Sequence, residues 1–471
     1  MKTMSVVLFV LLITSFALAQ QRWTKTYGGT TNCGGNSAQQ TADGGYIITG
    51  YINGAVSSDV YLIKTNTSGD TVWTRIYGGT GDDEGYSVQQ TADGGYIVVG
   101  YTLSFSASGD VYLIKTDSSG DTIWTKTYGG TGNDIVYSVQ QTADLGYIVT
   151  GYTSSHGAGS QDVYLIKTNA SGDTLWTRTY GGTDDDEGYS VRQTPDGGYI
   201  IAGYTNSFGA GTYYAYLIKT NASGDTLWTR TYGGGLSAEG NSVRQTSDGG
   251  YIVTGYTYLS AGTTYDLFLV KTNAAGDTLW TRTYGGAGAD YGYSVRQTTD
   301  GGYIVTGTTR LSPNFDVNVY LVRTNAFGDT LWTSKYGGGA DDEGYSVQQT
   351  TDGGYVIAGF TNSFGGVYNV YLIKTDANGS IGVQEPGNGR NVAAGSIRAV
   401  PNPFVSFARV PGHEAEQFEL YDISGKLVGA YRGDRIGEGL SPAVYFIRLD
   451  AKSGRSLRVV KVGTRVEVIG S

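Results

Sequence analysis

The sequence predicts an all-β fold, a seven-bladed β-propeller of four-stranded antiparallel blades followed by a small C-terminal β-sandwich. Three observations support this prediction. Tryptophan occurs seven times, at intervals of 50 to 52 residues, each time at the start of one long repeat. Each repeat contains four strand-like runs, and repeats of this length are typical of solenoids, propellers and arrays. The last repeat ends without the Trp run that follows each of the others.

The repeat that begins at Trp176 shows the elements of one unit. Its runs are rich in Tyr, Thr, Val and Ile, which favour β-strands. The run 199–204 is apolar at successive positions, which indicates a strand buried on both faces. The segments 196–198 and 222–225 contain the Gly and Asx residues that tight hairpins need. A parallel β-helix is the alternative, but four strands joined by hairpins fit a propeller blade better.

The two ends of the repeat region predict how the ring closes. The Trp run 23–29 has no strand before it, and the run 370–375 is not followed by another Trp run. We expect the first run to complete the last blade, which removes the open sheet edges. Seven repeats then form seven blades. The Trp pattern also resembles that of quinoprotein-type propellers, in architecture only, since no cofactor-binding residue of that class can be matched.

The first 19 residues are typical of a secretory signal peptide. Lys2 is followed by the apolar run 6–16 and by Ala17-Leu18-Ala19, so cleavage is expected between Ala19 and Gln20. The apolar run is shorter than a bilayer-spanning helix. We therefore expect a secreted or outer-surface protein with no transmembrane anchor.

The composition excludes several classes of function. A net charge of −10 argues against nucleic acid as a partner, because binding phosphates requires a basic surface. The chain has two histidines and one cysteine, Cys33, so it has no intramolecular disulfide and little room for a His-ligated metal. No nucleophile elbow, H-E-x-x-H motif or Cys/His cluster is present. We therefore assign no catalytic residue.

The repeat stops after Thr375, and the chain then divides further. Residues 20–381 are the expected propeller, 382–396 a linker rich in Gly and Asn, and 397–471 a separate module. Short strand-like runs, among them 418–428, 440–449 and 457–462, indicate that this module is a small β-sandwich.

The C-terminal module also resembles the Por-type (type A) sorting domain of type IX secretion in Bacteroidetes-like bacteria. The matching elements are P-N-P-F at 401–404, Y-D-I-S-G-K-L-V at 421–428, A-V-Y-F-I-R-L at 443–449 and V-V-K-V at 459–462. The resemblance implies that type IX machinery is a partner. Ala443 stands where that family commonly has glycine, and 464–471 extend past its usual end. An ordinary accessory sandwich is the alternative.

The predicted blades place the variable loops on one rim and the near-invariant hairpins on the other. Binding residues tend to lie on variable loops of a rigid scaffold, so we expect a ligand-binding site on the variable rim. Aromatic residues in these loops suit a glycan or protein ligand. Carboxylates could hold calcium, but a solvated rim without any cofactor is the favoured interpretation. The acidic residues are Asp82, Asp83, Glu84, Asp184, Asp185, Asp186, Glu187, Asp341, Asp342 and Glu343.

Three consecutive repeats differ from the others on the innermost strand. Arg192, Arg244 and Arg296 stand where the other four repeats have glutamine. Their side chains could face the axial channel or a neighbouring blade. A cluster in the channel would capture an anion, but the expected account is that the arginines pair with nearby carboxylates.

Together these observations favour an exported, non-enzymatic protein whose propeller is a binding or adhesion platform. An extracellular polysaccharide hydrolase or lyase using rim carboxylates is one alternative, because the separation of those carboxylates is not evident from sequence. A structural surface-layer component is another. The acidic motif recurs in repeats spread around the ring, which favours binding or structure over catalysis in one blade.

Overall fold

The computed structural model describes residues 22–209, 213–233, 237–258, 264–310 and 316–381, and the strands of the C-terminal module. The chain divides into two compact units, Met1–Gln384 and Glu385–Ser471. All regular elements within the described ranges are β-strands. No membrane-crossing helix is found in this part of the chain.

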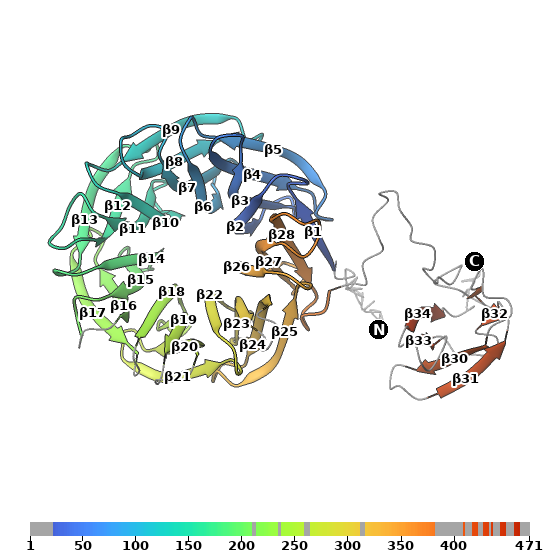
Figure 1. Cartoon of the computed structure of the whole chain (residues 1–471). Helices are drawn as coiled ribbons and strands as arrows, with labels where there is room; N and C mark the ends of the chain where they lie inside the picture. The colour runs from blue at the N-terminus through green and yellow to red at the C-terminus, as the bar shows by residue number, and fades with distance from the viewer. Residues whose placement is uncertain are drawn as a thin grey trace, which may run out of the picture. The chain divides into compact units, whose positions relative to one another are not determined.

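Seven four-stranded antiparallel sheets form a ring of blades (Figure 1), which confirms the predicted seven-bladed propeller. We number the blades 1 to 7 in chain order from β2. The innermost strands are β2 (Cys33–Gln40), β6 (Asp83–Gln90), β10 (Asp134–Gln141), β14 (Asp186–Gln193), β18 (Ser237–Gln245), β22 (Asp290–Gln297) and β26 (Asp342–Gln349). The second strands are β3 (Tyr46–Asn53), β7 (Tyr96–Thr102), β11 (Tyr147–Thr153), β15 (Tyr199–Thr205), β19 (Tyr251–Tyr258), β23 (Tyr303–Arg310) and β27 (Tyr355–Thr361).

The outer half of each blade follows the same pattern. The third strands are β4 (Ser58–Thr65), β8 (Asp110–Thr116), β12 (Asp162–Thr168), β16 (Tyr214–Thr220), β20 (Asp266–Thr272), β24 (Val317–Thr324) and β28 (Asn369–Thr375). The outermost strands are β5 (Thr71–Tyr77), β9 (Thr122–Tyr128), β13 (Thr174–Tyr180), β17 (Thr226–Tyr232), β21 (Thr278–Tyr284), β25 (Thr330–Tyr336) and, for blade 7, β1 (Trp23–Tyr27).

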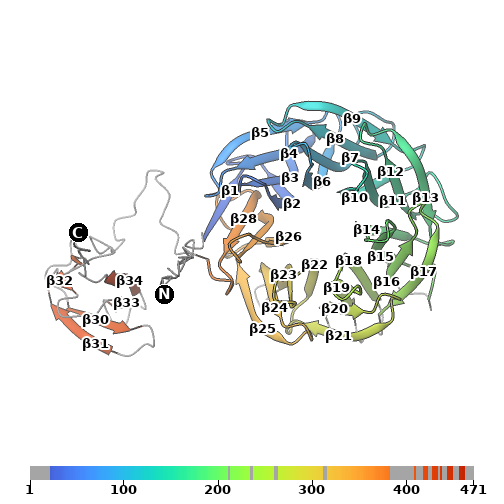
Figure 2. The same cartoon turned by 180° about the vertical axis from the view of Figure 1, so that it is seen from behind.

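Blade 7 is closed by the first strand of the chain, as the sequence predicts. Strand β1 pairs antiparallel with β28, so that Trp23 lies opposite Lys374 and Tyr27 opposite Val370. The two strands lie side by side from both directions of view (Figures 1 and 2). The ring is therefore held shut by residues from both ends of the propeller sequence.

Neighbouring blades are joined by a contact that explains the repeat. The ring of Trp176 in blade 3 packs on Gly224 in the outer hairpin of blade 4, where an added Cβ would lie 2.9 Å from the indole and φ is +80°. The Tyr180 hydroxyl donates to the carbonyl of the same Gly224 at 2.6 Å. The indole also meets Tyr199 edge to face at 5.8 Å. The Trp and Tyr of each outer strand therefore contact the glycine of the outer hairpin in the next blade, which explains why the W-x-x-x-Y and S-G-D motifs recur together.

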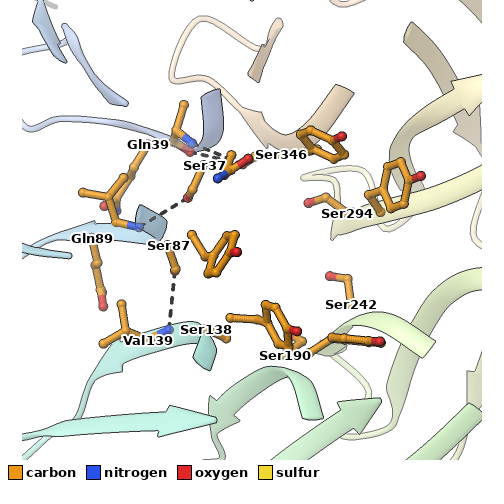
Figure 3. Close-up of a pocket in the computed structure, with 18 of the residues that line it drawn as sticks. Ser37, Gln39, Ser87, Gln89, Ser138, Val139, Ser190, Ser242, Ser294 and Ser346 are labelled. Atoms are coloured by element: carbon orange, nitrogen blue, oxygen red, sulfur yellow. Dashed lines mark hydrogen bonds between the residues drawn. The ribbon is translucent and has the colours of Figure 1, made fainter. Parts of the chain in front are cut away.

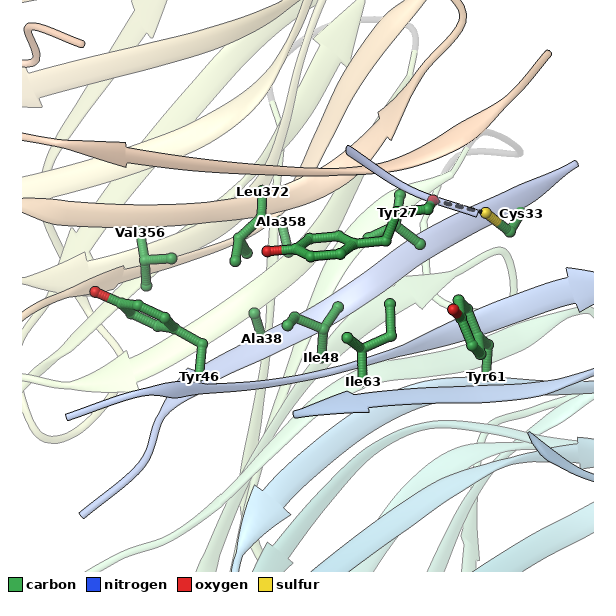
Figure 4. Close-up of a cluster of buried hydrophobic side chains, with 11 residues drawn as sticks. Tyr27, Cys33, Ala38, Tyr46, Ile48, Tyr61, Ile63, Val356, Ala358 and Leu372 are labelled. Atoms are coloured by element: carbon green, nitrogen blue, oxygen red, sulfur yellow. Dashed lines mark hydrogen bonds between the residues drawn. The ribbon is translucent and has the colours of Figure 1, made fainter. Parts of the chain in front are cut away.

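The core lies between blades, where the second and third strands are buried on both faces. Every residue of β15 is buried, as its run of successive apolar residues predicts. Figure 4 shows one such cluster between blades 7 and 1, in which Tyr46 and Ile48 face Val356 and Leu372. Each sheet is thus sandwiched by its neighbours, and no blade has a core of its own.

The described strands of the C-terminal module form two antiparallel groups. One is a four-stranded sheet in the order β31-β30-β33-β34, and the other pairs β29 with β32. The two-layer sandwich predicted for 397–471 stays a prediction. The expected linker 382–396 and the signal cleavage between Ala19 and Gln20 lie outside the described residues. The strands are β29 (Ala408–Arg409), β30 (Gln417–Asp422), β31 (Leu427–Arg432), β32 (Arg435–Ile436), β33 (Ala443–Arg448) and β34 (Ser456–Lys461).

Candidate functional site: the axial cavity

The seven innermost strands surround an axial cavity of about 260 Å³. Each of these strands carries a β-bulge at the same place, which in β14 falls between Gly188 and Ser190. A bulge inserts one residue and shifts the alternation of side chains by one position. Tyr189, Ser190 and Arg192 all line the cavity for this reason. Simple strand alternation therefore could not decide where the arginine side chains point.

A ring of serines follows the bulges around the cavity (Figure 3). The Oγ of Ser138 accepts the backbone N–H of Val191 in the next blade at 3.2 Å. The same bond recurs at all seven interfaces, and the bond between Ala38 and Ser346 closes the ring at 3.4 Å. A hydroxyl that accepts a bond keeps its own proton as a donor. The serines are Ser37, Ser87, Ser138, Ser190, Ser242, Ser294 and Ser346.

A second ring, made of glutamines, lies next to the serines and is interrupted by the three arginines. In four blades a glutamine side chain accepts a backbone N–H of the following blade, as Gln140 does from Gln193 at 2.8 Å. Arg192, Arg244 and Arg296 occupy the same position in blades 4 to 6. A guanidinium has no acceptor atom, so three consecutive interfaces lack this hydrogen bond.

The arginines have no carboxylate partner within the described part of the chain. Arg244 donates to the Val243 carbonyl at 3.1 Å, and Arg296 donates to the Val347 carbonyl at 3.3 Å. The Nε atoms of Arg192 and Arg244 are buried and unpaired. Burial lowers the pKa of Arg192 to about 9, to which the charge of Arg296 contributes. The pairing with nearby carboxylates that the sequence analysis favoured is therefore wrong at these three positions among the described residues.

The acidic runs do not form one continuous surface, because strand geometry separates their members. In the run 82–84, the Asp82 carboxylate lies at the exposed loop and accepts the N–H of Ser58 at 2.8 Å. Asp83 is fully buried, where it accepts the N–H of Gly79 at 2.9 Å and the hydroxyl of Ser104 at 2.5 Å. Glu84 follows as a half-buried side chain whose pKa is raised by burial.

The other two acidic runs repeat this separation. Asp186 accepts the Gly182 N–H at 2.9 Å, and Asp342 accepts the Gly338 N–H at 2.8 Å. Both are fully buried. The members that precede them in the chain are exposed or half-buried and belong to the rim loops: Asp184, Asp185 and Asp341. The buried aspartate directly before the glutamate of each run therefore holds a loop in place.

Glutamates and tyrosines lie together toward the end of the inner strands away from the arginines. We call the tyrosines at the bulge position the tyrosine belt: Tyr86, Tyr137, Tyr189, Tyr293 and Tyr345. Glu187 is 8% exposed and accepts the hydroxyls of Tyr204 at 3.1 Å and Tyr137 at 3.4 Å. Burial raises its pKa to about 7, and the charge of Glu239 adds to the effect. Glu343 accepts the Tyr345 hydroxyl at 2.8 Å, and its pKa is also raised by burial. Glutamates and arginines therefore lie toward opposite ends of the innermost strands, and only the arginines line the cavity.

Buried aspartates also meet between blades, above glycines of the connecting loops. An added Cβ at Gly129 would lie 2.3 Å from Asp110 Oδ1 and 2.9 Å from Asp134 Oδ2. The Oδ1 atoms of both aspartates are buried without a hydrogen-bond partner. Within the described ranges, three or more His, Cys, Asp or Glu side chains never gather as metal ligands would.

The sequence prediction included the arginines and glutamates but missed the serine ring and the tyrosine belt. Both rings recur at fixed positions of every or nearly every repeat, which resembles a structural requirement rather than a site. The useful signal was a break in the repeat. Asparagine replaces the belt tyrosine in two blades, as Asn36 in blade 1 and as Asn241 in blade 5, whereas the three arginines are confined to consecutive blades.

No family model matches the chain. Among curated proteins, it is 27% identical over 174 residues to the regulatory protein FlaEY of Caulobacter vibrioides, covering 32% of this chain and 18% of that protein. It is 24% identical over 210 residues to the uncharacterized WD repeat-containing protein L264 of Acanthamoeba polyphaga mimivirus, covering 34% and 15% respectively. The matched parts span less than a fifth of either relative.

Solved propellers are similar in fold at low sequence identity. The WD40 domain of Neurospora crassa Pan2 matches with a TM-score of 0.48 at 10% identity, covering 75% of this chain and 94% of that one. A family PL25 ulvan lyase bound to -[GlcA(1-4)Rha3S]- matches at 0.47 and 10%, covering 75% and 96%. Chaetomium thermophilum Sqt1 bound to the N-terminus of ribosomal protein L10 matches at 0.45 and 10%, covering 75% and 98%. The likeness extends to the fold alone.

Proposed function

We propose that this protein is a non-enzymatic binding protein whose axial cavity takes an acidic ligand. The observation that carries the proposal is the cluster of Arg192, Arg244 and Arg296, which lines the cavity without any carboxylate partner among the described residues. Buried charges are normally paired, and arginine is suited to carboxylate, sulfate and phosphate groups. The missing counter-charge is supplied by a ligand.

The surroundings of the arginines support an anion. The serine hydroxyls of the neighbouring ring line the same cavity, and a hydroxyl such as that of Ser138, which accepts a backbone N–H, retains a proton that it can donate. The arginines also replace glutamines that would join the blades, at an expected loss of about 0.5–1.5 kcal/mol for each hydrogen bond. Substitutions that remove hydrogen bonds between blades are characteristic of functional sites.

The test is the triple variant Arg192→Gln, Arg244→Gln and Arg296→Gln, which restores the residue that the other blades have. We expect sulfate, phosphate and glutarate to raise the Tm of the parent protein and to leave that of the triple variant unchanged. We also expect the triple variant to melt higher without ligand, because three interblade hydrogen bonds are restored. The control is Arg178→Gln, which removes a half-exposed arginine on the outer strand.

Equal Tm shifts in the parent and triple variants would overturn the proposal. A shift lost in the Arg178→Gln variant would show instead that general surface charge is responsible. Turnover of a polysaccharide, lost when rim carboxylates are replaced, would favour the hydrolase or lyase alternative. The buried carboxylates Asp83, Asp186 and Asp342 argue against that alternative, because each already holds a loop through fixed hydrogen bonds.

We further propose that the protein is exported and sorted by its C-terminal module. The support is the signal-like segment 1–19 and the motifs between 401 and 462. N-terminal sequencing of the secreted protein should begin at Gln20. Deleting 397–471 should leave the protein inside a type IX-competent host, whereas secretion of the truncated chain would refute the sorting role.

A further inference from the structure

The lining of the axial cavity is rich in hydrogen-bond donors and, among the described residues, contains no carboxylate. The guanidinium groups of Arg192, Arg244 and Arg296 are donors without any acceptor atom. A serine hydroxyl that accepts a backbone N–H, as Ser190 does from Val243 at 3.3 Å, keeps its own proton to donate. A ligand that fills this space is therefore expected to carry mainly acceptor atoms.

The glutamines that line the cavity in the other four blades add further donors. Gln39 and Gln89 lie beside the serine ring (Figure 3). The Oε1 atom of Gln39 accepts the N–H of Gln90 at 2.7 Å, and that of Gln89 accepts the N–H of Gln141 at 2.7 Å. Their Nε2 groups have no acceptor among the described residues. These amide groups therefore remain available to acceptor atoms of a ligand.

The positive charge of the cavity is concentrated on one side. The arginines occupy adjacent positions in blades 4 to 6, and the glutamines hold the equivalent positions in blades 7, 1, 2 and 3. The three arginine side chains are half-buried, so a molecule in the cavity can reach them. Burial and then the charge of Arg296 lower the pKa of Arg192 to about 9. A singly charged ligand would leave two of the three guanidinium charges uncompensated, whereas three acidic groups would compensate all of them.

The volume of the cavity favours an organic anion over an inorganic one. Its 260 Å³ equals the volume of about nine water molecules at about 30 Å³ each. A single sulfate or phosphate leaves most of this space to water. A carboxylate is planar and binds a guanidinium through two parallel hydrogen bonds. Three carboxylates on a short carbon chain therefore suit both the three arginines and the space around them.

Resting on the proposed function, we propose that the ligand of the axial cavity is a small organic tricarboxylate. One carboxylate binds each of Arg192, Arg244 and Arg296, and the rest of the molecule faces the glutamine side. There the Nε2 groups of Gln39 and Gln89 donate to its remaining oxygen atoms. The cavity disfavours amino acids and peptides, because an ammonium group would find no carboxylate in the lining and a buried charge needs a partner.

The test is isothermal titration of the full chain at pH 7 with propane-1,2,3-tricarboxylate, glutarate and butyrate, which carry three, two and one carboxylates. We expect the tricarboxylate to bind about tenfold more tightly than glutarate, the effect of one further charge-assisted contact, and glutarate to bind more tightly than butyrate. Arg244→Gln, which restores the residue of the other blades, should abolish the preference for the tricarboxylate over glutarate. The control variant Arg178→Gln, on the outer strand, should leave all three affinities unchanged.

The outcomes separate this inference from the proposed function. If glutarate binds the parent protein as tightly as the tricarboxylate, and the triple arginine variant loses both, the anion site stands and the tricarboxylate ligand is refuted. The same conclusion follows if inorganic triphosphate binds as tightly as the tricarboxylate, or if Arg244→Gln keeps the full preference. If none of the carboxylates, sulfate and phosphate binds, both proposals fail. Equal weakening by Arg178→Gln and Arg244→Gln would refute both as well, because general charge would then explain the binding.

Discussion

Single residues that break the repeat carry most of the information about this protein. In six interfaces a backbone N–H donates to a glutamine of the next blade, as Ala143 does to Gln193 at 2.9 Å. The seventh interface, between blades 4 and 5, lacks this bond. Pro195 stands at the donor position there and, as a proline, has no N–H to donate to Gln245. Such departures are visible only because the other repeats show what the position normally does.

Leu145 is a departure with a direct consequence for stability. Its φ is +65°, in a turn where the other six blades have glycine. The left-handed region costs a residue with a Cβ about 1–2 kcal/mol, which a change to glycine would recover. Glycine also gives the unfolded chain more conformational freedom, and this cancels part of the recovered stability. Because Leu145 is 54% exposed, little packing is lost. We expect Leu145→Gly to raise the free energy of unfolding by about 0.5–1 kcal/mol, as measured by urea denaturation.

The control for this prediction is Leu175→Gly. Leu175 is 56% exposed but lies within β13 without a positive φ. Glycine there should lower stability, since it only adds freedom to the unfolded chain. Equal effects of the two substitutions would show that backbone strain at Leu145 is negligible.

Glu187 gives the propeller a pH dependence whose sign can be worked out. Its folded pKa of about 7 lies above the ordinary value of 4.5. Its contribution to stability is therefore fully present below pH 4.5 and is lost as the pH rises through 7. At about 1.4 kcal/mol per pKa unit, the loss is about 3 kcal/mol.

Glu187→Gln should be more stable than the parent protein at pH 8 and similar at pH 4.5. Urea denaturation at the two pH values measures the difference. If the difference in unfolding free energy between variant and parent is the same at both pH values, Glu187 titrates with an ordinary pKa.

At the scale of elements, the innermost strand does two different tasks. Its half nearest the variable loops provides buried aspartates that hold the loops, and the half after the bulge lines the cavity. The bulge is what allows Tyr189 and Ser190, adjacent in sequence, to face the same space. The same strand thus supports the scaffold and presents the site.

The aspartate pair between blades 2 and 3 yields a prediction at this scale. Burial and the charge of Asp134 raise the pKa of Asp110, so the pair opposes folding when both are ionised. The equivalent pair in blades 6 and 7 is Asn318 with Asp342, above Gly337. We expect Asp110→Asn to raise the Tm at pH 7 and to have no effect at pH 3, where the carboxyls are neutral.

A fall in Tm at pH 7 would contradict this prediction and indicate a cation held by both carboxylates. Repeating the melt with calcium chloride and with EDTA separates the two accounts. We propose that no cofactor is required, so EDTA should leave the Tm of the parent protein unchanged.

At the scale of the whole molecule, stability depends on closing the ring. The blades share their cores, so an unpaired edge in blade 7 would expose surface that belongs to two sheets. Strand β1 supplies Trp23, which packs on Gly69, and Tyr27, which donates to the Gly69 carbonyl at 2.7 Å. The first strand therefore completes blade 7 and also holds blade 1.

Deleting residues 22–29 should lower the Tm by 10 °C or more and promote association through the exposed edge of β28. Differential scanning calorimetry and size-exclusion chromatography measure both effects. Removing the last eight residues, 464–471, is the length-matched control. A deletion variant that melts with the parent protein would show that closure by β1 contributes little.

Much of the architecture was predictable because the repeat samples each position seven times. A turn glycine, a buried strand or an interface tryptophan is recognisable when it recurs at a fixed place. The site was harder to predict for the same reason, since its serines and tyrosines recur as regularly as the scaffold does. The direction of Arg192 depends on a bulge that the spacing of apolar residues does not reveal.

The sequence alone determined the number of blades, the order of strands and the closure of the ring, because these follow from periodicity and from the unpaired runs at 23–29 and 370–375. Only the tertiary structure decided that the arginines face a shared cavity, while the acids separate into exposed loop residues, buried aspartates that hold the loops, and glutamates bonded to tyrosines. The reason is physical: periodicity constrains neighbours along the chain, whereas the cavity is formed by one short stretch from each of seven blades. Its charge balance exists only once the ring is closed.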